Sequence, residues 1–203
     1  MRGGIVLAGG KSTRMQNIDK ALITIRKRTM ISLVIEPLKQ VVDEIVVVAA
    51  NEEQGARLRP WIGECKLAYD KIKDYGPLAG ILSGMEALHS ELAFVAACDM
   101  PFINQRVVEL LFDRALGCDA LIPRWDNGRL ETLHAVYRRE PMISAAKKAI
   151  ERGEHIILAA AFALPEVKYI PVEEIKKIDP ELKTFINVNT PDELRRLAIN
   201  IKG

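Results

Sequence analysis

Residues 45–48 read Ile-Val-Val-Val, a run of β-branched side chains with no polar residue among them. A strand that is covered on both faces can be apolar throughout, whereas a strand with one face in water alternates apolar and polar residues. Residues 5–8 and 92–98 form two further apolar runs of strand length. Between these runs, residues 78–88 carry apolar side chains at the spacing of a helix. The alternation predicts an α/β fold with an open, largely parallel sheet and crossover helices.

Turn and cap residues place the other elements. We expect strands at 5–8, 21–25, 44–50, 66–69, 92–98, 119–123, 133–137 and 167–172. We expect helices at 30–40, 52–61, from 77 onward, from Asn104 as the cap to 116, at 141–152 and 156–164, and from Pro191 to about residue 200.

The second half of the chain departs from the alternation of strands and helices. Asp126, Asn127 and Gly128 predict a hairpin tip between strands 119–123 and 133–137. Thr190 and Glu193 have the spacing of a capping box at the start of the last helix. The chain has no internal repeat, low-complexity segment or linker, so we expect a single domain over residues 1–203.

Composition excludes several classes of function. The formal net charge of +2 over 203 residues gives no field that would attract nucleic acid or an acidic membrane, and we expect neither as a partner. Three cysteines without a C-x-x-C pair argue against a disulfide framework or a structural zinc site. The longest apolar run, 156–164, is far shorter than the ~20 residues of a membrane span. We therefore expect a soluble, cytoplasmic protein that is a monomer or a weak oligomer.

The segment after the first strand combines glycines with cations. Gly9 and Gly10 allow the backbone to turn and to approach a bound group, and Lys11, Arg14 and Lys20 follow them. Peptide N–H groups beside cations suit a polyphosphate, so the segment predicts a site for a nucleoside triphosphate. A glycine turn with solvated basic residues is the alternative.

Two better-known phosphate-binding loops do not fit this segment. A Walker A loop would require a glycine at position 5, where the chain has Ile5 inside the strand. The dinucleotide-binding spacing of glycines also fails, because Lys11, Ser12 and Thr13 follow Gly10.

Polar residues follow four of the predicted strands. Gly9, Asn51, Asp70 and Asp99 each stand at or just after a carboxyl end, where ligands bind in open α/β sheets. Asp99 ends a strictly apolar strand, and one such carboxylate suffices for Mg²⁺, which completes its shell with water and substrate phosphates. The alternatives are that Asp99 caps the next helix and that Asp70 is a turn residue.

No nucleophile is evident in the sequence. G-x-S-x-G and H-E-x-x-H are absent, and the three histidines are scattered. His134 fits either a substrate-facing surface or a plain cross-strand pair. Trp61 and Trp125 fit either packing or the rim of a site.

Five motifs together resemble the molybdenum cofactor guanylyltransferase (MobA) family, a branch of the Rossmann-like nucleotidyltransferases. They are L-A-G-G-K-S-T-R-M (7–15), D-K (19–20), G-P-L-A-G (76–80), C-D-M-P (98–101) and N-V-N-T-P-D (187–192). The resemblance covers nearly the whole chain and implies a three-layer Rossmann-like nucleotidyltransferase fold. It also implies transfer of GMP from GTP to molybdopterin-bound molybdenum, with Mg²⁺ as cofactor and pyrophosphate as second product.

The resemblance further implies roles for single residues. Leu7, Ala8 and Gly9 would present backbone to the guanine, Lys20 would contact the phosphates, and Asp99 would hold Mg²⁺ beside the nucleotide. Asn51 and Asp70 would contact GTP, Arg14 the triphosphate, and Asn187 and Asn189 the molybdopterin-type acceptor. Many members have glycine where this chain has Gln16, so this chain departs from the family pattern in the loop.

The implied chemistry matches the residues present. The acceptor's terminal phosphate would attack the α-phosphorus of GTP in line, so catalysis would rest on positioning and charge neutralisation rather than on a protein nucleophile. Two alternatives stay open. One is a sister nucleotidyltransferase that uses CTP on molybdopterin or GTP on adenosylcobinamide phosphate. The other is a non-catalytic nucleotide-binding sensor with the same fold.

Overall fold

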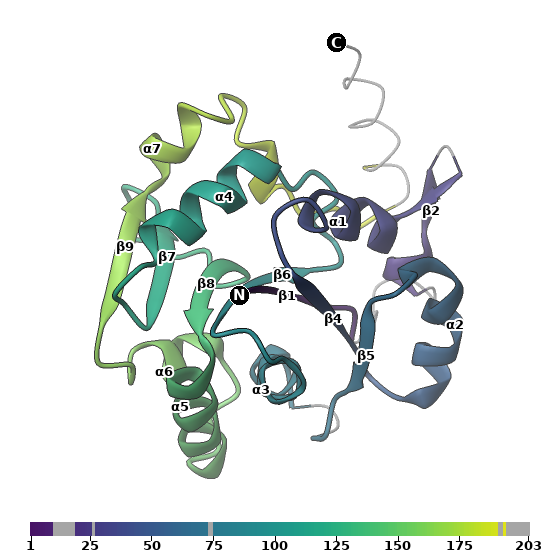
Figure 1. The fold of residues 1–203 in the computed structure, drawn as a ribbon, viewed down its shortest axis with the longest axis horizontal. Helices are drawn as coiled ribbons and strands as arrows, with labels where there is room; N and C mark the ends of the chain where they lie inside the picture. The colour runs from purple at the N-terminus through teal and green to yellow at the C-terminus, as the bar shows by residue number, and fades with distance from the viewer. Residues whose placement is uncertain (10–18, 26, 73–74, 191–192, 194–203) are drawn as a thin grey trace.

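The computed structural model describes residues 1–9, 19–25, 27–72, 75–190 and 193. In these residues seven strands form one sheet in the order β5-β4-β1-β6-β8-β7-β9 (Figure 1). The strands are β1 (Arg2–Leu7), β4 (Glu44–Ala49), β5 (Lys66–Tyr69), β6 (Leu92–Ala97), β7 (Ala120–Arg124), β8 (His134–Arg138) and β9 (Val167–Pro171). The run β5-β4-β1-β6 is parallel, and β7 and β9 are parallel to each other. Only β8 is antiparallel to its neighbours, β6 and β7. The predicted mostly parallel sheet is therefore confirmed.

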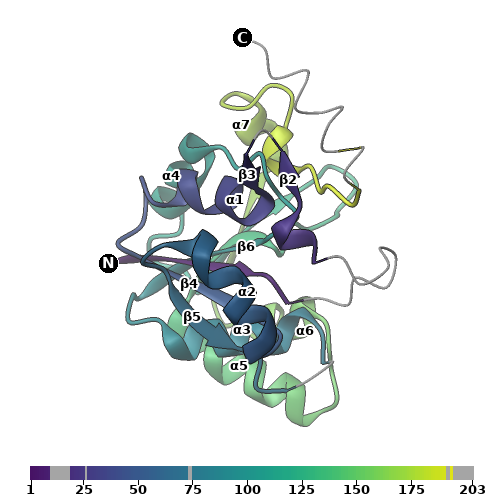
Figure 2. The ribbon, with the colours of Figure 1, turned by 90° about the vertical axis from the view of Figure 1, so that its right-hand side faces the viewer.

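Helices cover both faces of the sheet (Figures 1 and 2). One face carries α1 (Met30–Leu38), α2 (Glu52–Ile62), α4 (Gln105–Arg114) and α7 (Val172–Lys176). The other face carries α3 (Pro77–Ala87), α5 (Arg139–Glu151) and α6 (Ile157–Ala161). No helix in the described residues is both long and apolar enough to cross a membrane.

Side chains of the central strands alternate between two cores. Val47 belongs to the core under α1, α2 and α4, whereas Val46 and Val48 belong to the core under α3 and α5. Val6 and Leu7 divide in the same way. Because both faces are covered, every side chain of such a strand is buried, which explains the absence of polar residues in these runs.

Two glycines of helix α3, Gly80 and Gly84, face the sheet and let the helix backbone approach β1. A Cβ on Gly84 would stand 2.7 Å from Cγ2 of Ile5, and a Cβ on Gly80 would stand 3.3 Å from Cδ2 of Leu7. Gly76, with φ of 86°, precedes the helix, and Pro77 takes its first position. These residues bring the N-terminus of α3 to the carboxyl end of β1.

Two sequence predictions need correction, and two short elements were not predicted. The strand expected at 21–25 is a 3₁₀ helix η1 (Lys20–Leu22) followed by β2 (Thr24–Ile25), which pairs with β3 (Arg28–Thr29). The helix expected at 156–164 ends at Ala161. After it, the N–H groups of Ala163 and Leu164 donate to the carbonyls three residues earlier. Helix α7 and a second 3₁₀ helix, η2 (Lys183–Phe185), were not predicted.

Several local predictions are confirmed. The side chain of Asn104 caps α4 by accepting a hydrogen bond from the N–H of Arg106. The hairpin turns at 125–129, where the N–H of Gly128 donates to the carbonyl of Trp125. The helix expected at 30–40 is present as α1 but ends two residues earlier, at Leu38, just after Pro37.

Candidate active site

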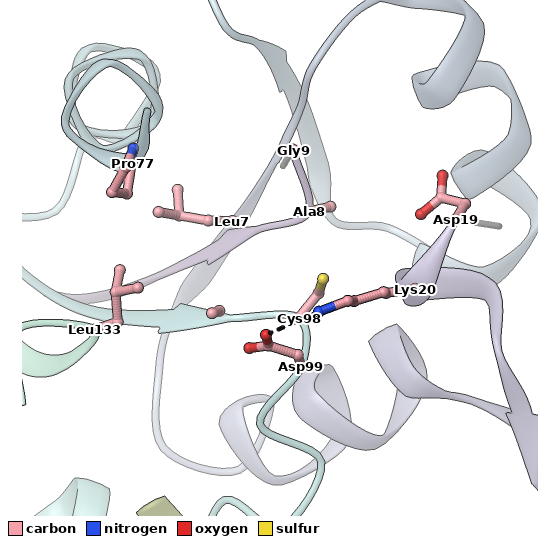
Figure 3. Close-up of a pocket in the computed structure, with 10 residues that line it drawn as sticks. Leu7, Ala8, Gly9, Asp19, Lys20, Pro77, Cys98, Asp99 and Leu133 are labelled. Atoms are coloured by element: carbon pink, nitrogen blue, oxygen red, sulfur yellow. Dashed lines mark ion pairs between the residues drawn. The ribbon is translucent and has the colours of Figure 1, made fainter. Parts of the chain in front are cut away.

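A pocket opens at the carboxyl ends of β1 and β6 (Figure 3). We call it the β1–β6 pocket, and its lining residues are Leu7, Ala8, Gly9, Asp19, Lys20, Pro77, Ala97, Cys98, Asp99 and Leu133. The chain continues from β1 to β4 and β5 on one side and returns to β6 on the other. Such a reversal of strand order is the usual ligand site of an open α/β sheet. The sequence prediction that Gly9 and Asp99 share one edge is confirmed.

The backbone at the end of β1 is already hydrogen-bonded. The N–H groups of Ala8 and Gly9 both donate to the carbonyl of Val48, at 2.9 and 3.1 Å. The N–H groups of Ala8 and Gly9 are therefore occupied within the protein. A Cβ on Gly9 would lie 3.1 Å from the nitrogen of Ala50, so the missing side chain admits the neighbouring strand end. Gly10, Lys11, Arg14 and Gln16 lie outside the described residues.

Lys20 lies between two side chains from distant parts of the sequence. Its Nζ donates to Oδ1 of Asn189 at 3.0 Å. The same Nζ lies 3.9 Å from Oδ2 of Asp99 (Figure 3). Asp19 caps the 3₁₀ helix η1 that begins at Lys20, because its Oδ1 accepts from the N–H of Ala21 at 3.2 Å. The 3₁₀ helix therefore directs a cation toward the only carboxylate besides Asp19 that lines the β1–β6 pocket in the described residues.

Asp99 carries a partly buried carboxylate. Burial raises its pKa, and the charge of Lys20 opposes that shift. The residue does not cap α4, because Asn104 does. The ammonium group of Lys20 is 3.9 Å away and neutralises the carboxylate only in part. The Asp99 side chain is only 25% exposed, so water does little to offset the remaining charge.

The donor set at Asp99 fits a magnesium ion rather than a structural metal. Three-membered clusters of His, Cys, Asp or Glu are absent from the described residues. Magnesium binds through one or two protein carboxylates and takes its other ligands from water and phosphate, so Asp99 alone meets its requirement.

The segment around Val188 joins the pocket to the end of the chain. The N–H of Val188 donates to the main-chain carbonyl of Asp99 at 2.7 Å, and the buried side chain packs with Ile23 and Met30. Asn187 and Asn189, on either side of it, are exposed. The predicted capping box is confirmed, because Glu193 and Thr190 exchange hydrogen bonds, and Glu193 also accepts from the N–H of Asn189. The rest of the expected last helix lies outside the described residues.

Asn51 and Asp70 lie at the same edge but line a neighbouring pocket with Tyr69. Oδ1 of Asn51 caps α2 by accepting from the N–H of Gln54 at 2.9 Å. Oδ1 of Asp70 accepts from the N–H of Ile72, and burial raises its pKa. Both side chains thus have structural hydrogen bonds and do not line the β1–β6 pocket.

The remaining candidates divide between core and pocket. His134 is fully buried, with Nε2 3.0 Å from Oγ1 of Thr184, and burial lowers its pKa to about 3. It is therefore a neutral core residue and faces no substrate. Trp125 is partly buried and donates from Nε1 to Glu131, whereas Trp61 is exposed. Sequence reasoning missed Leu133, the neighbour of His134, which lines the β1–β6 pocket.

Solved structures share this fold. The chain superposes on "A nucleotidyl transferase from Methanothermobacter thermautotroptrophicus" with a TM-score of 0.72 over 98% of this chain and 97% of that chain, at 16% identity. This likeness concerns the fold alone. Molybdopterin-guanine dinucleotide biosynthesis protein A from Archaeoglobus fulgidus is more similar, with a TM-score of 0.79 and 34% identity over 97% of this chain and 96% of that chain.

Sequence comparisons define the family. Residues 4–166 match the model of the MobA-like NTP transferase domain. The Methanosarcina mazei protein named "Probable molybdenum cofactor guanylyltransferase" is 41% identical over 99% of this chain and 92% of its own length. The "Molybdenum cofactor guanylyltransferase" of Desulfosudis oleivorans is 33% identical over 98% of this chain and 96% of its own. The chain belongs to the MobA-like NTP transferase family.

Proposed function

We propose that the protein transfers GMP from GTP to molybdopterin-bound molybdenum, forming the guanine dinucleotide cofactor and pyrophosphate, with Mg²⁺ bound at Asp99. One observation carries this proposal: Lys20 and Asp99 line the β1–β6 pocket and Asn189 holds the ammonium group of Lys20. The relatives that match this chain over nearly their full length bear the name of that activity. The three cysteines are free and buried, which suits the cytoplasm as the site of the reaction.

The state of the backbone at the end of β1 supports guanine as the base. The N–H groups of Ala8 and Gly9 are occupied by Val48, whereas carbonyl oxygens keep a second lone pair. Guanine presents donors at N1 and N2, which such carbonyls can accept. Adenine N1 and cytosine N3 are acceptors that would need a free N–H group, and each of these bases has only its amino group as a donor on that edge. This complementarity favours GTP over ATP and CTP.

Each residue then has a role in in-line phosphoryl transfer. Lys20 neutralises charge on the triphosphate, and Asn189 orients its ammonium group. Asp99 would hold Mg²⁺, which when bound supplies further neutralisation of phosphate charge. Asn187 and Asn189, the exposed residues that flank Val188, would contact the acceptor. With the acceptor phosphate as nucleophile, positioning and charge neutralisation account for catalysis, and no protein nucleophile is needed.

The test measures binding and turnover separately. Calorimetric titration with GTP, CTP and ATP in the presence of Mg²⁺ should show GTP binding at least about tenfold more tightly. Pyrophosphate release with molybdenum-bearing molybdopterin should fall by about a hundredfold or more in Asp99→Asn, because the variant keeps the shape and loses the charge. Asp113→Asn, an exposed carboxylate on α4, is the matched control. Preferential binding of CTP would overturn the guanine assignment, and a near-normal rate in Asp99→Asn would remove Asp99 from the mechanism.

A further inference from the structure

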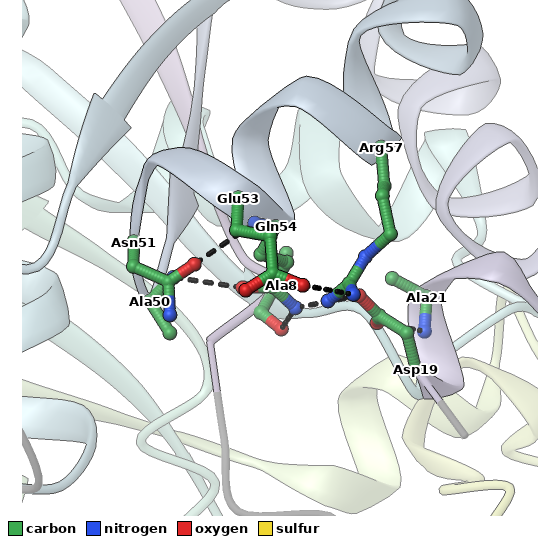
Figure 4. A network of polar contacts seen from close by, with 8 residues as sticks. All are labelled: Ala8, Asp19, Ala21, Ala50, Asn51, Glu53, Gln54 and Arg57. Atoms are coloured by element: carbon green, nitrogen blue, oxygen red, sulfur yellow. Dashed lines mark hydrogen bonds and ion pairs between the residues drawn. The ribbon is translucent and has the colours of Figure 1, made fainter. Parts of the chain in front are cut away.

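Gln54 is a buried amide beside the β1–β6 pocket. It lies in the first turn of α2 and is 7% exposed. Its Oε1 accepts from the N–H of Ala50 at 2.7 Å, and its Nε2 donates to the carbonyl of Ala8 at 3.0 Å and to Oδ2 of Asp19 at 2.9 Å (Figure 4). Both donor hydrogens and the acceptor oxygen are therefore used. The partners also fix the orientation of the amide, since a backbone N–H can only donate and a carbonyl can only accept.

These contacts exceed what helix capping requires. A glutamine at the third helical position commonly reaches back to the N–H of the cap residue. Here the cap is Asn51, and Gln54 bonds instead to Ala50, one residue earlier. From this position the amide spans the gap between the carboxyl ends of β4 and β1. The main-chain hydrogen bonds between these two strands stop after those that the carbonyl of Val48 accepts. The side chain thus replaces a peptide group between two diverging strands.

The third contact connects Gln54 to the cation of the site. Oδ2 of Asp19 accepts from Gln54, and Oδ1 of the same carboxylate holds the N–H of Ala21 in the 3₁₀ helix that begins with Lys20. Arg57, one turn further along α2, lies 3.7 Å from Oδ2 of Asp19. Rotation of the Asp19 carboxylate would turn the 3₁₀ helix and move the ammonium group of Lys20 away from Asp99 and Asn189.

We propose that Gln54 is a positioning residue for the nucleotide, which fixes the Ala8 carbonyl beside the base and, through Asp19, the Lys20 ammonium group beside the phosphates. This inference rests on the proposed function, because it assumes that a nucleoside triphosphate occupies the β1–β6 pocket. It assigns to α2 a part in the site although none of its side chains lines the pocket in the described residues.

A double-mutant cycle tests the hydrogen bond between Gln54 and Asp19. Gln54→Glu keeps the oxygen that accepts from the N–H of Ala50. Its second oxygen replaces the amide nitrogen and cannot donate to the Ala8 carbonyl or to the Asp19 carboxylate. We therefore expect the Kd for GTP with Mg²⁺ to rise by about tenfold or more. Adding Asp19→Asn supplies an N–H donor for the new carboxylate. The double variant should therefore bind GTP more tightly than Gln54→Glu alone, although it carries one substitution more.

Controls separate this effect from lost stability. Gln40→Glu makes the same chemical change on an exposed residue after α1 and should leave the Kd unchanged. Ser90→Ala removes a buried hydrogen bond at the opposite edge of the sheet, so it should lower Tm without changing the Kd. Each Kd is measured below the Tm of its variant. If Gln54→Glu does not fold, Gln54→Met, which keeps the length and loses all three contacts, takes its place and should raise the Kd by about tenfold.

The outcomes are distinct. A Kd of Gln54→Glu or Gln54→Met within about twofold of the wild type would overturn the role of Gln54. So would a double variant that binds no better than Gln54→Glu. If the folded wild type does not bind GTP, the proposed function fails, and the inference about Gln54 falls with it.

Discussion

Lys20 joins groups that are far apart in the sequence. Its ammonium group contacts Asn189, 169 residues later, and faces Asp99 at the end of β6. Its side chain is largely shielded from water, so its charge acts more strongly on a neighbouring phosphate than it would on the surface. We expect this cation to bear most of the phosphate contact made by the described residues.

Lys20→Met tests this expectation, because it keeps the length of the side chain and removes the charge. We expect kcat/KM for GTP to fall by about a hundredfold, since a preorganised charge facing the triphosphate is lost. Steady-state pyrophosphate release measures the effect. Lys176→Met, on the exposed part of α7, should retain wild-type kinetics. A value for Lys20→Met within about threefold of the wild type would show that residues outside the described part carry the phosphate contact.

Among elements, α3 packs closely against the sheet through a glycine. The backbone of the helix approaches β1 at Gly84, where no side chain separates it from Ile5. Gly84→Ala places a methyl group in space already occupied, so the free energy of unfolding should fall by about 1–3 kcal/mol despite the better helix propensity of alanine.

Urea unfolding of Gly84→Ala, Ile5→Ala and the double variant measures this contact. Removing the Ile5 side chain makes room for the new methyl group, so the cost of the double variant should be less than the sum of the two single costs. Strict additivity would mean that α3 moves away from the sheet instead.

Strands and helices differ in how far the sequence predicts them. The runs that form β1, β4 and β6 are predicted because burial on both faces removes every polar residue, and the glycine and carboxylate that follow them identify the functional edge. Helix α7 has only five residues, and packing rather than periodicity determines so short a helix. Gln54 is missed for another reason: its partners Asp19 and Ala8 lie 35 and 46 residues away, so only the fold brings them together.

In the molecule as a whole, binding and structural groups occupy opposite edges of the parallel strands. The carboxyl edge carries the β1–β6 pocket. At the amino edge, Oε1 of Glu44 accepts from the N–H of His89, the N–H of Ser90 and Oγ of Ser90 at 2.6–2.8 Å. Burial opposes the charge of Glu44, but these hydrogen bonds together outweigh it and lower its pKa below the ordinary value of 4.5.

The lowered pKa of Glu44 makes stability depend on pH. Since the folded pKa is below the unfolded one, this contribution is fully present above about pH 4.5 and is lost as pH falls through the folded value. Ser90→Ala removes one of the hydrogen bonds, so it should reduce the free energy of unfolding by about 1–2 kcal/mol at pH 7 and by less near pH 3. Denaturant titrations of wild type and variant across this range measure the difference. An equal deficit at both pH values would show that Ser90 acts through packing alone.

The hydrogen bond from Val188 to the carbonyl of Asp99 has a mechanical consequence. Asp99 presents its side chain to the β1–β6 pocket and its main chain to the segment that carries Asn187 and Asn189. A ligand that shifts Asp99 would therefore also shift the segment 187–189. Coupling between ligands on the two sides of this peptide unit would be reciprocal, with the same free energy whichever of them binds first.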